Sequence, residues 1–132
     1  MADLHGFTGP AWIGVDLDGT LAEYHGWVGP EHIGAPIPKM LERVLAWTEK
    51  CREVRIVTAR VSPIKDDCEE CRAAVQKWLH KHVYPKCPVW FREPIQMEFT
   101  VTHEKDQKML ELWDDRCVQV IPNTGERADG KE

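Results

Sequence analysis

The stretch Ile13-Gly14-Val15-Asp16-Leu17-Asp18-Gly19-Thr20-Leu21 decides the fold that this sequence predicts. It is a short apolar run that ends in two aspartates two residues apart, and a glycine and a threonine follow at once. Short, continuous apolar runs are typical of strands buried in parallel sheets. At the carboxyl end of such a strand Gly19 lets the backbone turn away, so both carboxylates can face one crevice. Two acids held this close repel each other, which indicates a site that binds a cation or performs a reaction.

The length, composition and charge of the chain limit its organisation. With 132 residues we expect a single domain, with a core at about 11–122 and a polar tail at 124–132. Hydrophobic residues make up 42% and charged residues 30%, as is ordinary for a globular domain. The formal charge of -5 provides no general basic field for nucleic acid. An anionic substrate would therefore need local help from a metal ion and a few placed cations.

The location of the protein is predicted from the segments that the sequence lacks. No run approaches the roughly 20 apolar residues of a membrane span. The first residues also lack the charged start and apolar stretch of a signal peptide. We therefore expect a cytoplasmic protein without a membrane partner, whose five cysteines stay reduced.

Apolar runs alternate with helical periods along the rest of the chain. Such alternation predicts an α/β fold with a parallel sheet, whose crevice lies at the carboxyl ends of its strands. The predicted strands cover about 11–17, 54–58, 97–102, 108–113 and 117–121. The predicted helices begin at Pro38 and at Ser62-Pro63, and they end at about Lys50 and His82.

Residues 21–36 are dense in glycine and proline, and they read as a loop or small hairpin. Three side chains in this flap, Tyr24, His25 and Trp27, have two interpretations of equal weight. They contact a substrate over the strand ends, or they cover the edge of the sheet.

Cysteines near two histidines raise the alternative of a zinc site. Cys68, Cys71 and the later Cys87 are its candidate ligands, with His80 and His82 nearby. The helical period, however, assigns Cys68 and Cys71 to the core, where free cysteine is a common small apolar residue. The histidine spacing matches no standard zinc finger. Core packing is the favoured interpretation, and zinc binding stays open.

Four segments, in this order, resemble the motifs of the haloacid dehalogenase (HAD) superfamily of phosphatases and phosphotransferases. Asp16-x-Asp18-Gly19-Thr20 resembles the first motif, and Thr58, at the end of an apolar strand, resembles the second. Lys105, with Lys108 as the alternative, matches the lysine of the third, and Asp114-Asp115 matches the acid pair of the fourth. The resemblance covers about 11–125 and implies a three-layer Rossmann-like fold that is capless, with only a small flap.

The resemblance also implies a mechanism. Asp16 would attack phosphorus and form an aspartyl-phosphate, and Asp18 would act as general acid and then base. Mg²⁺ would be held by Asp16, the backbone carbonyl of Asp18 and Asp115, with Asp114 assisting. Thr58 and Lys105 would bind phosphoryl oxygens, with Ala59 and Arg60 beside them. Arg60 has a second interpretation, which is to pair with an acid.

Within the superfamily, Asp18 points to a phosphatase, because a departing alcohol needs a proton whereas a halide does not. Ile56-Val57-Thr58-Ala59-Arg60 and Trp113-Asp114-Asp115-Arg116 resemble small capless phosphatases, often phage-like. More distant likenesses are to polynucleotide phosphatase domains and deoxyribonucleotidases. The expected substrate is a nucleotide or another small phosphate. The alternatives are a 3′- or 5′-end phosphatase on nucleic acid, and a non-catalytic binding protein of the same fold.

Overall fold

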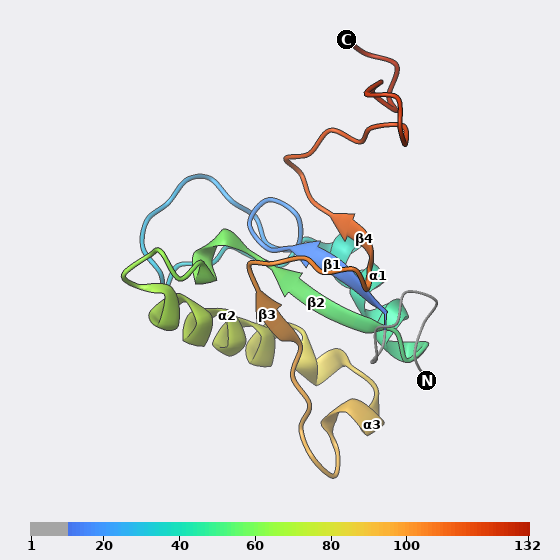
Figure 1. The fold of residues 1–132 in the computed structure, drawn as a ribbon. Helices are drawn as coiled ribbons and strands as arrows, with labels where there is room; N and C mark the ends of the chain where they lie inside the picture. The colour runs from blue at the N-terminus through green and yellow to red at the C-terminus, as the bar shows by residue number, and fades with distance from the viewer. Residues whose placement is uncertain (1–10) are drawn as a thin grey trace.

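The computed structural model describes residues 11–132, and the predicted lead-in at residues 1–10 lies outside them (Figure 1). Strands and helices alternate along the chain, as predicted. The elements are β1 (Trp12–Asp16), α1 (Pro38–Glu49), β2 (Glu53–Val57), a 3-10 turn (Ala59–Val61), α2 (Cys68–His82), a second 3-10 turn (Tyr84–Lys86), α3 (Val89–Arg92), β3 (Thr100–Thr102) and β4 (Met109–Trp113).

The strands form one parallel sheet in the order β3-β2-β1-β4. Asp16 at the end of β1 lies beside Val57 at the end of β2, and Val15 lies beside Trp113 in β4. All four strands run in the same direction, so residues that follow β1, β2 and β4 meet at one edge of the sheet. The predicted α/β class with a parallel sheet is confirmed.

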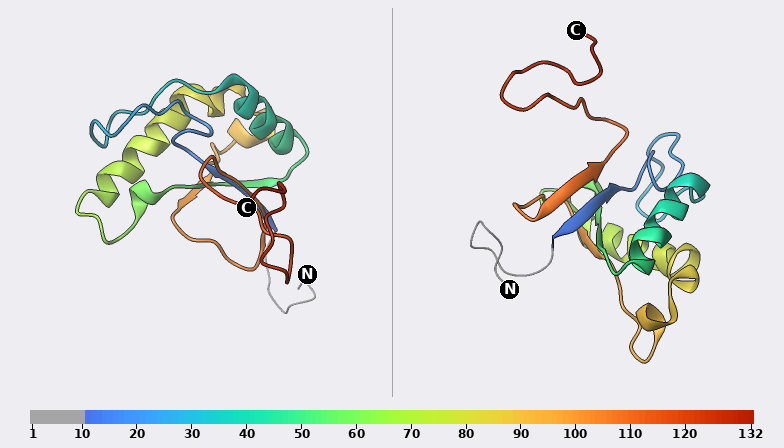
Figure 2. Two further views of the ribbon diagram at one scale, coloured as in Figure 1. Left: turned by 90° about the horizontal axis from the view of Figure 1, so that it is seen from above. Right: turned by 90° about the vertical axis from the view of Figure 1, so that its right-hand side faces the viewer.

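Helices α1 and α2 lie on the same side of the sheet (Figure 2). The strand residues facing them belong to the apolar core, whereas Trp12 on the opposite face donates a hydrogen bond from its indole nitrogen to Asp106, at 2.8 Å. Asp106 lies in the segment between β3 and β4, which crosses that opposite face without forming a helix (Figure 1). The described residues therefore form two layers instead of the predicted three, because the return from β3 to β4 is too short to contain a covering helix.

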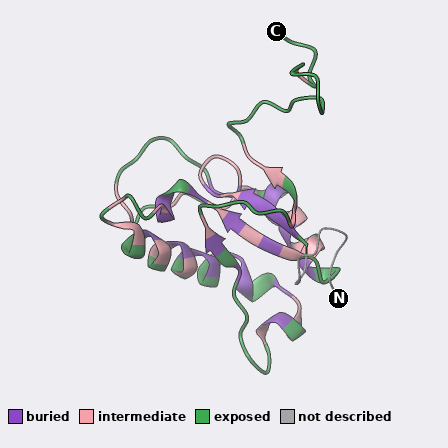
Figure 3. Ribbon diagram, in the orientation of Figure 1, coloured by how far each residue is buried: buried purple, intermediate pink, exposed green. Residues whose placement is uncertain are grey.

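The core between the sheet and the helices is continuous, and buried residues line the inner faces of both (Figure 3). Alternate residues of β2, Val54 and Ile56, are buried, and so are Val44 of α1 and Leu79 of α2. Phe91 of α3 is also buried and belongs to the same core, so the connection between α2 and β3 contributes to it. Helix α1 matches its predicted bounds closely.

Helix α2 begins at Cys68, six residues later than predicted. Ser62 has extended backbone angles, φ -60° and ψ 130°. It precedes a proline, and the helical conformation is disfavoured for a residue in that position. Ile64, which would lie in the first turn of the predicted helix, is 91% exposed as a result. Residues 62–67 are instead a loop that leaves the carboxyl edge of the sheet.

Residues 117–121 do not form the predicted last strand. Their chain turns back on itself, with the Ile121 amide donating to the Glu126 carbonyl and the Ala128 amide donating to the Gln119 carbonyl. Val118 and Val120 are about half exposed, at 52% and 48%. Residues 117–121 thus form part of a local turn instead of a strand. The tail extends away from the sheet (Figure 1). Among residues 11–132, no helix combines the length and the apolar character that crossing a membrane requires.

Candidate active site

A cavity of about 630 Å³ lies at the carboxyl edge of the sheet. Its walls come from the ends of β1 and β2, the flap, the loops that follow β2 and β3, and the residues after β4. They include most of the residues singled out from the sequence: Asp16, Asp18, Tyr24, Trp27, Thr58, Ala59, Arg60, Asp114 and Asp115. Segments far apart in the sequence therefore meet at one site, as the strand-end motifs predicted.

Three carboxylates form an acidic cluster on one side of this cavity. Each of Asp16, Asp114 and Asp115 offers an oxygen, and these oxygens all lie within 4.8 Å of one another. Asp16 and Asp114 are partly buried, and Asp115 is exposed. Hard oxygen donors at this spacing suit Mg²⁺, which is bound through a few carboxylates together with water and phosphate oxygens. The donor set therefore fits the predicted ion.

Burial and the two neighbouring acids disfavour the charged form of Asp16 in the acidic cluster. Burial raises the pKa of Asp16 from 3.8 to about 7, and both the hydrogen bond with Asp115 and the charge of Asp114 add to the rise. A hydrogen bond from Thr20 acts in the opposite direction. A divalent cation among the three acids would favour the charged carboxylate, and would so offset both the cost of its burial and the repulsion from Asp114.

The turn after β1 brings the first and last acids together. Gly19 has a φ of +88°, and a Cβ at this position would collide with the Asp115 carboxylate, so both conformation and space require glycine. Next to it, the Thr20 hydroxyl lies 3.2 Å from an Asp16 oxygen and accepts a 3.1 Å hydrogen bond from the Asp115 amide. Gly19 and Thr20 thus fix the spacing between Asp16 and the chain after β4.

Thr58 lies directly after β2 and is buried, with 3% of its surface exposed. Its hydroxyl oxygen caps the short 3-10 turn by accepting a 3.2 Å hydrogen bond from the Arg60 amide. That bond uses the oxygen as an acceptor and leaves the hydroxyl proton for another partner. Thr58 lines the cavity, so a group in the cavity can be that partner.

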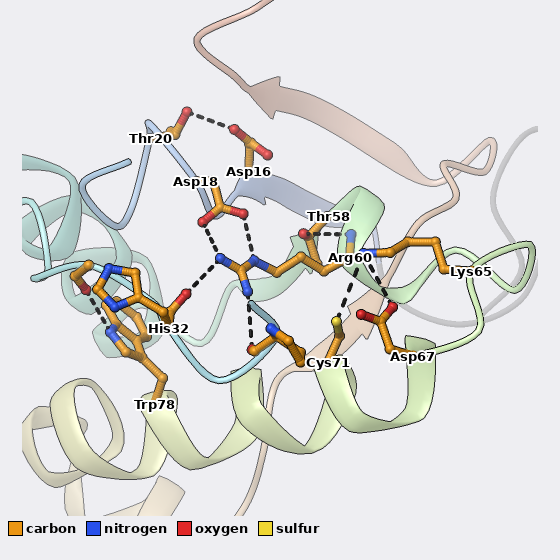
Figure 4. A network of polar contacts seen from close by, with 12 residues as sticks. Asp16, Asp18, Thr20, His32, Thr58, Arg60, Lys65, Asp67, Cys71 and Trp78 are labelled. Carbon is orange, nitrogen blue, oxygen red and sulfur yellow. Dashed lines mark hydrogen bonds and ion pairs between the residues drawn. The ribbon is translucent and has the colours of Figure 1, made fainter. Parts of the chain in front are cut away.

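The side chain of Asp18 is not part of the acidic cluster. It turns toward Arg60, whose guanidinium donates to both carboxylate oxygens at 2.7 and 2.9 Å, while Asp16 turns toward Thr20 (Figure 4). Arg60 is only 5% exposed, and it also donates to the flap carbonyls of Pro30 and His32. Of its two interpretations, the structure shows the ion pair with an acid.

One lysine that the motifs did not indicate lies at the site. Lys65 lines the cavity and is partly buried, with its ammonium 3.6 Å from an Asp67 oxygen. Lys105 is exposed in the β3–β4 connection and is not among the residues that line the cavity, although its neighbour His103 is. No sequence signal identified Lys65, because residues 62–67 were predicted to belong to a helix, whereas in the structure they form the loop that leaves the end of β2.

The flap has no strand and is closed at its base by a bridge between Ala22 and Pro36. Tyr24 and Trp27 line the cavity, whereas His25 does not. Both aromatic rings keep large exposed surfaces, 44% for Tyr24 and 47% for Trp27. Their interpretation as substrate contacts therefore has a structural basis that the sheet-edge interpretation lacks.

The cysteines are all free thiols in the structure. Cys71 and Cys87 are buried, and among residues 11–132 the aspartates of the acidic cluster form the only group with metal-binding geometry. Burial raises the pKa of both buried thiols, which disfavours the thiolate that zinc requires. The arrangement fits core packing rather than a zinc site.

Comparisons with protein-family models, curated proteins and solved structures return no match to this chain.

Proposed function

We propose that this protein is a Mg²⁺-dependent phosphomonoester hydrolase that forms an aspartyl-phosphate on Asp16. The observation that carries the proposal is the convergence of Asp16, Thr58 and Asp115 on one cavity from three separate strand ends. This is the arrangement implied by the resemblance to HAD phosphatases. A capless site with a small flap also leaves the cavity open to a phosphorylated substrate.

The first chemical step uses Asp16 and Asp18. A carboxylate oxygen of Asp16 forms a bond to phosphorus as the bond from phosphorus to the ester oxygen breaks, and Asp18 gives that oxygen its proton. Both oxygens of Asp18 accept from Arg60 in the structure, so its side chain must rotate toward the ester oxygen for this step. In the second step Asp18 takes a proton from water, which attacks phosphorus and releases phosphate and free Asp16.

The other residues stabilise charge on the phosphoryl oxygens. Thr58 donates its hydroxyl proton, and Lys65 takes the role that the motif order assigned to Lys105, because Lys65 is the lysine that lines the cavity. Asp16, Asp114 and Asp115 would hold Mg²⁺, which supplies positive charge opposite the phosphoryl group when bound. Positioned charges of this kind carry most of the catalysis in phosphoryl transfer.

The test is hydrolysis of an aryl phosphate by the purified protein with MgCl₂. We expect turnover that a chelator abolishes and that Asp16→Asn lowers by about 10⁴-fold or more, as loss of a nucleophile does. Asp66→Asn, an exposed acid outside the cavity, is the matched control and should keep full activity. Unchanged activity in Asp16→Asn would remove this residue as the nucleophile. A folded wild-type protein that binds phosphate and Mg²⁺ without turnover would favour the non-catalytic alternative.

A further inference from the structure

Two aromatic side chains of the flap remain without a role in the chemistry. Tyr24 and Trp27 line the same cavity as Asp16 and Asp18, and both are nearly half exposed. Neither belongs to the apolar core among the described residues. A large aromatic surface left open toward a polar site is a feature that a ligand would cover.

The ring of Trp27 is held by cations of the site. The guanidinium carbon of Arg60 lies 4.8 Å from the ring centroid, and the ammonium of Lys65 lies 4.4 Å from it. Arg60 is itself fixed by its ion pair with Asp18 and by the flap carbonyls. Contacts between a cation and an aromatic ring are attractive, so Trp27 is positioned rather than loose.

The contacts of Trp27 place it on the side of the leaving group. In the proposed reaction Asp18 faces the ester oxygen that departs, and Arg60 joins Asp18 to Trp27. The group attached to the ester oxygen therefore extends toward the flap. The side chains that the flap supplies to this cavity are Tyr24 and Trp27, whose flat aromatic faces suit a planar base better than a sugar ring.

We infer that Tyr24 and Trp27 form a stacking subsite for the base of a nucleoside monophosphate, which is the substrate class of this enzyme. The inference rests on the proposed function and names its substrate. The cavity of about 630 Å³ is in the range of small-molecule sites. The net charge of -5 favours a mononucleotide over a nucleic-acid strand, whose backbone needs a basic surface.

The test compares adenosine 5′-monophosphate with ribose 5-phosphate, which carries the same phosphate and sugar without the base. We expect wild-type protein to prefer the nucleotide in kcat/KM. Trp27→Ala should lower this preference by roughly 5- to 150-fold, the loss expected for one base-stacking contact. Trp27→Phe should keep most of the preference, since it keeps an aromatic face. Trp90→Ala, a tryptophan of similar exposure outside this cavity, is the matched control and should leave the preference unchanged.

A binding measurement separates this inference from the proposed function. Titration of Asp16→Asn with the same two phosphates in MgCl₂ reports binding without turnover. Tighter binding of the nucleotide that depends on Trp27 supports the subsite even if no variant hydrolyses phosphate. Hydrolysis of both phosphates with equal efficiency, insensitive to Trp27→Ala, would overturn the subsite and leave the hydrolase standing. A 5′-phosphorylated oligonucleotide preferred over the mononucleotide would overturn the substrate class.

Discussion

The two sides of the cavity are built differently. The acidic side comes from the ends of β1 and β4, where strand register and the Thr20 hydrogen bonds set the distance between Asp16 and Asp115. The cationic side comes from the loop after β2 and from the flap, where Arg60 and Lys65 surround Trp27. Paired strands therefore set the spacing of the acidic cluster, whereas loops hold the groups that would select and neutralise the proposed substrate.

Apart from loss of Asp16 itself, the largest expected effect tests whether the cationic side contributes to catalysis. Lys65→Ala should lower kcat/KM for an aryl phosphate by about 10²- to 10³-fold, the usual cost of removing one positioned stabilising group. Lys105→Ala, which removes an exposed lysine outside the cavity, should lower it by less than about threefold. Steady-state kinetics of both variants at saturating MgCl₂ measure this. If Lys105→Ala had the larger effect, Lys105 would be the third-motif lysine, and Lys65 on the cationic side would not have the proposed role.

The next effect concerns the acidic side and the pH dependence of stability. In metal-free protein Asp16 holds a proton up to about pH 7, whereas in the unfolded chain it releases it near 3.8. The folded state therefore binds more protons between these values, and the free energy of unfolding contributed by Asp16 falls as the pH rises through this window. We expect a loss on the order of 1 to 2 kcal/mol, because partial exposure screens the charge.

Denaturant unfolding at several pH values, with wild type compared to Asp16→Asn, isolates this contribution. The difference between the two proteins should change between pH 4 and 7 and should shrink when MgCl₂ is present, because binding to the folded state is stabilising. Asp66→Asn should show no such difference. A pH-independent difference between wild type and Asp16→Asn would mean that the acids do not repel one another as the structure indicates.

The smallest expected effect concerns the link between the two acidic strand ends. Thr20→Val removes the hydroxyl that contacts Asp16 and accepts from the Asp115 amide. Loss of such a hydrogen bond costs about 1 kcal/mol, so Mg²⁺ affinity should fall by about 5-fold. Thr20→Ser keeps the hydroxyl and should keep the affinity. Calorimetric titration with MgCl₂ measures the difference, and equal affinity in all three proteins would show that strand register alone holds the acids.

The acidic side was predictable from the sequence because its residues follow apolar runs directly. Asp16 is the last residue of β1 and Thr58 comes directly after β2, and parallel pairing then brings these strand ends together. Asp115 could be placed for the same reason, two residues after β4. Predicting that these strand ends meet requires no knowledge of side-chain positions, since the register of a buried sheet is strongly specified.

The cationic side was not predictable because it depends on the path of loops. Lys65 reaches the cavity since residues 62–67 stay out of the helix, a result of Pro63 and of the cap by Thr58. The pairing of Arg60 with Asp18 joins two motifs that the sequence suggests only separately. One local pattern also misled, because residues 117–121 form a turn in place of the predicted strand. The third layer that the resemblance implied is not found among the described residues.

The Arg60 guanidinium joins three parts of the molecule at once. It holds the second acid of the first motif, two carbonyls of the flap and the face of an indole. A displacement of the flap would therefore disturb Asp18 and Trp27 together, because Arg60 contacts both of them. In the proposed reaction, entry of a substrate under the flap and proton transfer by Asp18 would therefore be coupled through one side chain.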